Sequence, residues 1–244
     1  MKISAISDVH VKDTNDKAHA LLVDFFAHPL VQDSDYILLL GDIFDLMCGP
    51  HEEYLRKYQE IFSKMDELQK KGKKIFFFEG NHDVHLEKLF KKLWKNGEII
   101  ISQDAIVEEI EGKLYYFSHG DEHEIDNISY QKYIRFIRSA PLKFIAEFVM
   151  PYSLLNYLGE RASRMSRKKG YKKFNEEKVR SRFRSGVLEK TKGAFDFVLG
   201  GHSHVQDQWI LPESKSLYLN NGFALQSKTF IYIENHEFRF EPLS

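Results

Sequence analysis

Five short runs of apolar and β-branched residues predict β-strands, because each ends abruptly in polar residues. Apolar positions at helical spacing occupy Lys17–Phe26 and Tyr54–Lys71, between the first three runs. The alternation of strand and helix predicts an α/β fold with a largely parallel sheet at the start of the chain. The five predicted strands are Lys2–Ser7, Tyr36–Leu40, Lys74–Glu79, Leu114–Ser118 and Phe195–Leu199.

The pattern changes from Ile99 onward, where short alternating runs are separated by turn pairs. Glu111-Gly112 precedes Leu114, and Asn221-Gly222 precedes Phe223. Such pairs favour tight turns between strands. We therefore expect antiparallel strands or a second sheet in this part of the chain.

The stretch 126–194 has few predicted strands and reads as helical. Aromatic and aliphatic residues recur at helical spacing over 130–137 and again over 144–149, after Pro141. We therefore divide the chain into a core, 1–125 and 195–244, and a helical cap insertion, 126–194.

The second half of this insertion is strongly basic. Residues 161–184 contain eleven Lys and Arg against two Glu, a local charge of +9 in a chain whose net charge is -1. A charge of this size in one segment favours binding of an anion, although a solvated helical face has the same composition.

Composition limits the class of protein. With 244 residues, 43% of them hydrophobic and 29% charged, the chain is long enough for one large domain or one domain with an insertion. No apolar run reaches the roughly 18 residues that cross a bilayer, and no signal peptide pattern begins the chain. We expect a cytoplasmic protein, with peripheral contact to the inner face of the membrane through the cap.

Polar residues that can bind metals or phosphates follow all five predicted strands. Groups just past the carboxyl ends of strands in an α/β sheet converge on one crevice, and glycines let the backbone turn sharply there. The five motifs are Asp8-Val9-His10, Gly41-Asp42-Ile43-Phe44-Asp45, Gly80-Asn81-His82-Asp83, Ser118-His119-Gly120-Asp121 and Gly201-His202-Ser203-His204.

The residue types predict two divalent metal ions. Mixed carboxylate, imidazole and carboxamide ligands suit Mn, Fe, Zn or Co better than calcium or a structural zinc site, and Mn is our first expectation. A carboxylate such as Asp42 can bridge two ions, which about 3.5 to 4 Å apart can share a hydroxide and hold the oxygens of a phosphorus centre. The candidate ligands are Asp8, His10, Asp42, Asn81, His119, His202 and His204.

In this order the motifs resemble those of the calcineurin-like metallophosphoesterases, over residues 1–125 and 195–244. The resemblance implies a two-sheet αββα sandwich and attack of a metal-bound hydroxide on a phosphoester or pyrophosphate bond. It also implies that His82 stabilises phosphoryl charge or protonates the leaving oxygen, with Asp83 as its orienting carboxylate. A neighbouring carboxylate would raise the pKa of such a histidine. The implied ligands are Asp8, His10, Asp42 and His204 for the first metal, and Asp42, Asn81, His119 and His202 for the second.

The insertion is similar to that of a narrower group, the UDP-2,3-diacylglucosamine diphosphatases of lipid A synthesis. In that group a helical cap holds two acyl chains, while polar cap residues bind the glucosamine and phosphates. That group has Arg where this chain has His82, and Asp where Asn127 falls. The substrate contacts implied by position are Asn127, Arg164, Ser166, Lys169 and Lys173.

Two other functions fit the same residues. A nuclease or cyclic-nucleotide phosphodiesterase would use the basic segment 161–184 along a nucleic acid backbone. A non-catalytic, protein-binding scaffold of the same fold would have lost its metal ligands, whereas all seven are present here. We expect a phosphorylated small molecule or lipid-linked nucleotide sugar as the substrate.

Overall fold

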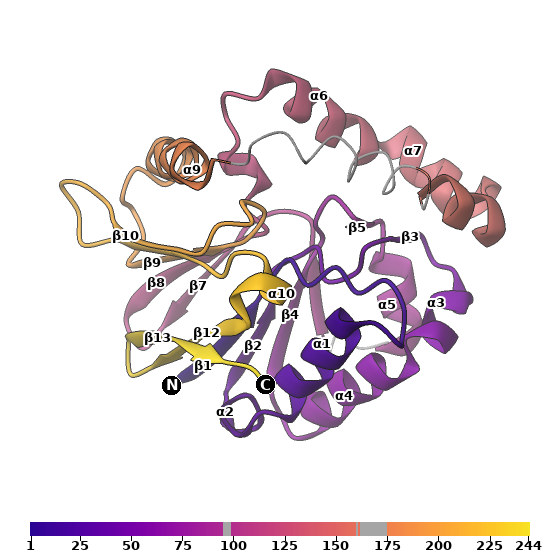
Figure 1. The fold of residues 1–244 in the computed structure, drawn as a ribbon, viewed down its shortest axis with the longest axis horizontal. Coiled ribbons are helices and arrows are strands. Elements are labelled where there is room, and N and C mark those ends of the chain that lie inside the picture. The colour runs from indigo at the N-terminus through magenta and orange to yellow at the C-terminus, as the bar shows by residue number, and fades with distance from the viewer. Residues whose placement is uncertain (95–98, 160, 162–174) are drawn as a thin grey trace.

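The computed structural model describes residues 1–94, 99–159, 161 and 175–244. Two β-sheets pack face to face, and helices cover their outer faces (Figure 1). This is the predicted αββα arrangement. The first sheet has the strand order β13 (Glu237–Pro242), β12 (Thr229–Glu234), β1 (Lys2–Ile6), β2 (Tyr36–Leu39), β4 (Lys74–Phe78) and β6 (Ile99–Ser102).

Strands β1, β2 and β4 of the first sheet are buried on both faces, which explains their mostly apolar sequence. In β4, Ile75 and Phe77 pack against the helical layer, whereas Phe76 and Phe78 pack against the second sheet. Because successive side chains of a strand point to opposite faces, one run of apolar residues contributes to two separate cores.

The opening of the chain forms the predicted parallel order. Strands β1, β2, β4 and β6 are parallel, and β12 and β13 are added antiparallel. Helix α1 (Lys17–Ala27) begins at Asp16, whose side chain accepts a hydrogen bond from the amide of His19. The short helices α2 (Pro29–Asp33) and α5 (Glu87–Leu93) complete this half.

The single helix predicted over Tyr54–Lys71 is wrong in one respect, because the structure divides it at Tyr58. Helix α3 (Glu52–Lys57) and helix α4 (Gln59–Lys70) meet there, where the backbone leaves helical geometry. The Tyr58 side chain is buried against Phe44, and its hydroxyl lies 3.2 Å from the carbonyl oxygen of Lys12. The break between α3 and α4 therefore lies where Tyr58 is anchored beneath the first motif loop.

The second sheet is mixed. Its order is β10 (Asp207–Ile210), β11 (Leu217–Asn220), β9 (Phe197–Gly200), β8 (Lys113–Phe117) and β7 (Ile106–Ile110), with β8, β9 and β11 parallel. The turn Glu111-Gly112 joins β7 and β8 with positive φ at both residues, as a tight hairpin requires. Asn221-Gly222 instead precedes the short helix α10 (Ala224–Ser227), so no strand begins at Phe223.

Helices dominate the described part of 126–194. Figure 1 shows α6 (Ile128–Ile137) and α7 (Ala140–Phe144) above the ends of the sheets, followed by the π-helix η2 (Ile145–Val149) and a helical stretch over 152–159. Helix α9 (Glu176–Thr191) packs through Val187 on the outer face of the second sheet. Within the described residues, no helix combines the length and apolar character needed to cross a membrane.

Candidate metal centre

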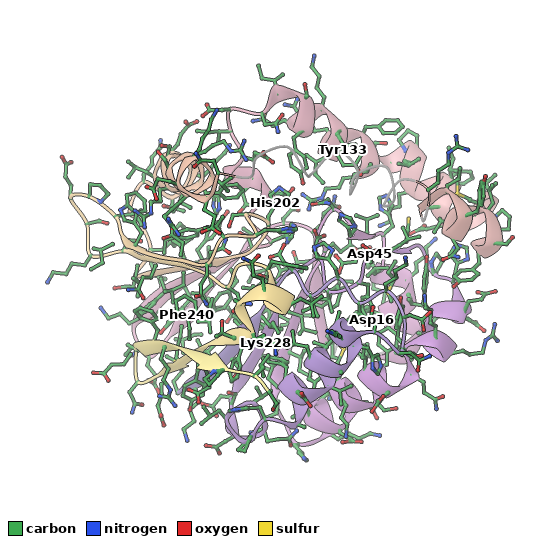
Figure 2. All side chains as sticks on the ribbon, viewed as in Figure 1. Asp16, Asp45, Tyr133, His202, Lys228 and Phe240 are labelled. Atoms are coloured by element: carbon green, nitrogen blue, oxygen red, sulfur yellow. The ribbon has the colours of Figure 1, made fainter. Side chains whose placement is uncertain are left out.

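The motif loops meet at one edge of the two sheets. Asp8, Asp42 and Asn81 follow β1, β2 and β4 of the first sheet, whereas His119 and His202 follow β8 and β9 of the second. Three further elements lie here. They are the paired strands β3 (Met47–Cys48) and β5 (Asp83–Val84) and the 3₁₀ turn η1 (Asp121–His123). Figure 2 shows His202 and Asp45 at this edge, below the cap.

Four of the predicted ligands form a first cluster, Asp8, His10, Asp42 and His204, whose ligand atoms all lie within 4.8 Å of one another. The Nε2 atoms of His10 and His204 are 3.2 Å apart, and Nε2 of His204 is 3.3 Å from Oδ1 of Asp8. Converging imidazole nitrogens and carboxylate oxygens are the donor set of a first-row divalent cation.

A second cluster, Asp42, His119 and His202, meets the same distance limit and shares Asp42 with the first. Nδ1 of His119 donates to the carbonyl oxygen of Leu40 at 2.8 Å, so Nε2 faces the cluster and becomes the acceptor when it loses its proton to a cation. That Nε2 is buried, lies 3.8 Å from Oδ2 of Asp42, and has no hydrogen-bond partner in the described chain. A buried acceptor aimed at a shared carboxylate fits a metal ion.

Asn81 lies against the shared carboxylate. Its amide and that of His82 both donate to Oδ1 of Asp42 at 2.9 Å. Its side-chain oxygen accepts a hydrogen bond from the hydroxyl of Tyr130 in α6 at 3.1 Å. A carboxamide oxygen has two lone pairs, so one remains for a cation.

Charge within the clusters keeps the carboxylates ionised. Although burial raises the pKa of Asp42, the neighbouring histidines, His82 and His119 first, hold it well below its usual range. Burial lowers the pKa of His10 to about 4. For His119, burial lowers the pKa, but the charges of Asp42, Asp121 and Asp8 and the bond to Leu40 together outweigh it, and the pKa rises to about 9. Cation binding at this site would therefore displace protons.

Five of the clustered residues have left-handed backbone conformations, which non-glycine residues rarely adopt. Hydrogen bonds hold the loops in this state: the amide of Asp8 donates to Gly41, that of His10 to Asp42, and that of His202 to the Asp8 carboxylate. Each such conformation costs about 1 to 2 kcal/mol, so the surrounding fold must determine it. The five φ angles are 53° (Asp8), 54° (His10), 51° (Asp42), 65° (His202) and 58° (His204).

The pairing expected between His82 and Asp83 is wrong. The buried Asp83 carboxylate accepts four backbone amides, those of Asp42, Ile43, Phe44 and Gly80, and so joins the second and third motif loops. Burial first, then the charge of Asp42, raises the pKa of Asp83 to about 7. Nδ1 of His82 instead lies 2.8 Å from the carbonyl oxygen of Asp45. Adjacent residues on a turn point in different directions, so Asp83 positions backbone rather than the imidazole.

Gly80 makes close contact with the shared ligand, and this gives a testable expectation. A Cβ at this position would collide with Oδ1 and the amide of Asp42. We expect Gly80→Ala to displace the Asp42 carboxylate, reduce bound metal, and lower stability by about 1 to 3 kcal/mol through overpacking. Metal analysis after gel filtration, together with thermal unfolding, measures both effects. Gly200→Ala is the matched control, because its Cβ would meet only ordinary contacts. Full metal content in Gly80→Ala would contradict the expectation.

Some residues at the site lie outside the five motifs and were not predicted. Glu124 is buried and its Oε2 lies 3.2 Å from Nε2 of His202, while its Oε1 forms an ion pair with Arg182 at 2.9 Å. A carboxylate beside a metal-binding histidine typically fixes the ring. Arg138, directly after the end of α6, pairs with Asp121 at 2.9 Å. The run of charged residues directly after His119-Gly120 was the available signal for Glu124.

The predicted substrate contacts fall mainly outside the described residues. Arg164, Ser166, Lys169 and Lys173 belong to 162–174, which the structure does not describe. Asn127 is described: its side chain caps α6 at the amide of Tyr130 and donates to Oε1 of Glu124.

The described half of the basic segment is partly neutralised by ion pairs. Arg182 pairs with Glu124, Arg184 pairs with Asp207 at 2.6 Å, and Arg180 lies between Glu177 and Asp207. For these three arginines, pairing with carboxylates of the same chain accounts for much of the positive charge.

Comparisons with known proteins agree with this geometry. A family model described as calcineurin-like phosphoesterase matches residues 1–206. The UDP-2,3-diacylglucosamine hydrolase of Blochmanniella floridana is 27% identical over 84% of this chain and 80% of that protein. The protein of the same name from Porphyromonas gingivalis is 26% identical over 82% and 83%. That from Photorhabdus laumondii is 30% identical, but the match spans about half of each chain, 52% and 51%.

Solved structures show the same fold. The crystal structure of TT1561 of Thermus thermophilus superimposes with a TM-score of 0.52 at 12% identity, covering 100% of this chain and 99% of that one.

Proposed function

The chain belongs to the calcineurin-like phosphoesterase family and is a metal-dependent phosphoesterase, and from that premise we propose that it hydrolyses the pyrophosphate bond of UDP-2,3-diacylglucosamine with two divalent cations. The observation that carries the proposal is the pair of donor clusters that share the Asp42 carboxylate. The modest but long matches to UDP-2,3-diacylglucosamine hydrolases support the choice of substrate.

The first cation would be held by Asp8, His10, Asp42 and His204, and the second by Asp42, Asn81, His119 and His202. Manganese suits this mixture of nitrogen and oxygen ligands. When bound, such a pair of ions supplies Lewis acidity and an activated water for attack on phosphorus.

Among the protein side chains, His82 is the proposed proton donor or charge-stabilising group. Burial lowers its pKa, but the charges of Asp42 and Asp45 more than compensate, and the net shift is upward. The bond to the carbonyl oxygen of Asp45 fixes the ring, whose edge lies in the cavity beside the first cluster. A cationic imidazole there stabilises phosphoryl charge or protonates the leaving oxygen.

The cap, 126–194, holds the lipid half of the substrate. Support comes from α6, where Tyr130 contacts both Asn81 and the ring of His202, so the cap reaches the second cluster directly. Phe144 and Phe148 are 56% and 63% exposed on the cap, with Lys143 directly before Phe144 in the sequence. Such a face favours peripheral binding to a membrane surface, which flotation with anionic vesicles would test.

The substrate is tested by supplying the manganese-loaded protein with UDP-2,3-diacylglucosamine and following the phosphorus products by NMR. We expect UMP and 2,3-diacylglucosamine 1-phosphate, because hydrolysis of the pyrophosphate bond divides the molecule there. Combined replacement of Arg164, Lys169 and Lys173 by alanine should raise KM for this substrate and spare p-nitrophenyl phosphate, which needs the metal site alone. Preferred cleavage of oligonucleotides or cyclic nucleotides, with loss of a steep salt dependence in the same variant, would instead identify a nuclease or phosphodiesterase.

A further inference from the structure

A cavity of about 340 Å³ opens on the first cluster. Its lining includes the imidazoles of His10, His82 and His204 and the apolar side chains of Phe223 and Leu225. Its lining comes from the motif loops, α1 and the segment 223–225, and none of the described cap residues takes part. A volume of this size is at the lower end of small-molecule sites.

Phe223 presents a flat apolar surface in this cavity. Its ring is stacked on the imidazole of His204, with centroids 5.4 Å apart and planes 18° from parallel. The ring of His10 lies 6.0 Å away. The side chain is half-buried, so part of the ring stays accessible beside the candidate metal ligands.

The backbone holds Phe223 firmly at this place. Gly222 has a φ of +70°, and a Cβ there would lie 2.5 Å from the amide nitrogen of Gln206, so only glycine fits the turn. On the other side of Phe223, the amide of Ala224 donates to the carbonyl oxygen of Asp8 at 3.2 Å. The aromatic platform is therefore tied to the same loop that supplies a metal ligand.

The remaining lining of the cavity is mostly polar and charged. Lys12 and Lys17 are exposed there, and the carboxylates of Asp16 and Asp45 are nearby. Figure 2 labels both carboxylates, below the level of the cap. Lysines attract phosphate oxygens, whereas the Asp16 carboxylate already accepts the backbone amides of Lys12, Asp13 and His19.

The two clusters thus open to different surroundings. The second cluster is covered by the cap through Tyr130, with Glu124 of the core beside it, whereas the first faces the cavity with Phe223. A pyrophosphate substrate also has two unlike halves. From this correspondence we infer that Phe223 is a stacking platform for the nucleobase of the substrate, and that the nucleoside phosphate half occupies the cavity while the other half lies under the cap. The inference rests on the proposed function in that it takes one half of the substrate to be a nucleotide.

The test compares UMP with ribose 5-phosphate by titration calorimetry on the manganese-loaded protein. The two probes share the sugar and phosphate and differ in the base, so the ratio of their Kd values isolates the base. Stacking one base on one aromatic ring contributes enough for at least about a 5-fold ratio in favour of UMP. Any effect of a substitution on the metals changes both affinities and cancels in the ratio.

Phe223→Leu should bring the ratio close to one, and Phe223→Tyr should keep it. Phe136→Leu, which removes an aromatic ring that is 63% exposed on the cap, is the matched control and should keep the wild-type ratio. Equal binding of both probes by the wild type, or an unchanged ratio in Phe223→Leu, would overturn the inference.

The same measurements separate this inference from the proposed function. If the protein binds UMP through Phe223 but does not cleave UDP-2,3-diacylglucosamine, the nucleotide site is supported and the proposed substrate is wrong. If the protein cleaves this substrate but binds UMP and ribose 5-phosphate equally, the proposed function is supported and the stacking role of Phe223 is wrong.

Discussion

Asp42→Ala is expected to empty at least one metal site and to abolish most of the hydrolytic activity. Oδ2 of Asp42 lies 3.8 Å from Nε2 of both His10 and His119, so this one side chain serves both clusters. Without the shared negative charge, two cations held close together repel each other in a partly dehydrated site. The loss of metal affinity should exceed the roughly 10- to 100-fold cost of removing an outer partner of a ligand.

A second variant separates metal binding from folding. Asp42→Ala also leaves the amides of Asn81 and His82 without their acceptor, at a cost of about 1 to 3 kcal/mol for each buried donor. Asp42→Asn keeps an acceptor oxygen and removes the charge, so it should fold and still lose metal.

Elemental analysis after gel filtration gives the number of metals per chain, and the electron paramagnetic resonance spectrum of bound manganese shows whether two ions are coupled. Asp104→Ala, at an exposed turn, is the control and should bind metal like the wild type. Two metals in a folded, active Asp42→Ala protein would refute the shared position of Asp42.

His82→Ala should lower kcat by about 10²- to 10⁴-fold, the usual contribution of a general acid or of charge stabilisation, while metal content stays near that of the wild type. The reason is that His82 belongs to neither cluster that shares Asp42, and its Nδ1 is engaged with the carbonyl oxygen of Asp45. Ligand atoms of His82, His10 and Asp45 do lie within 4.8 Å of one another, so the metal content of this variant must be measured. Kinetics and metal analysis must be measured on the same preparation, since the distinction depends on the pair of values.

His51→Ala is a suitable control for the loss of an imidazole, because His51 packs beside Tyr54 and Tyr152, outside the clusters. Its kcat should match the wild type. If His82→Ala loses metal in proportion to activity, His82 is a ligand. If it keeps full kcat, His82 has no part in the reaction.

Local sequence was sufficient for much of the fold. The strands β1, β2 and β4 lie within one residue of their predicted ends, because strands buried on both faces must be apolar throughout. The convergence of the motif loops also follows from topology, since polar residues just past parallel strands meet at one edge of a sheet.

Three features depended on contacts between distant segments. The helix break at Tyr58 accompanies a hydrogen bond from its hydroxyl to Lys12, 46 residues away. Glu124 and Tyr130 reach the site because the chain after His119 folds back over it, and no local pattern encodes that path. The position of Phe223 beside His204 likewise follows from packing of the last segment against the first motif loop.

The contrast is clearest at His82 and Asp83. Their place in the third of five motifs that resemble those of the calcineurin-like metallophosphoesterases made them candidates for phosphoryl chemistry. Their directions came from the tertiary structure alone. Four buried amides from two loops require an acceptor, and only the Asp83 side chain occupies that position, which leaves His82 to bond with Asp45. Residue chemistry is local, whereas the partner of each buried polar group depends on which distant backbone lies beside it.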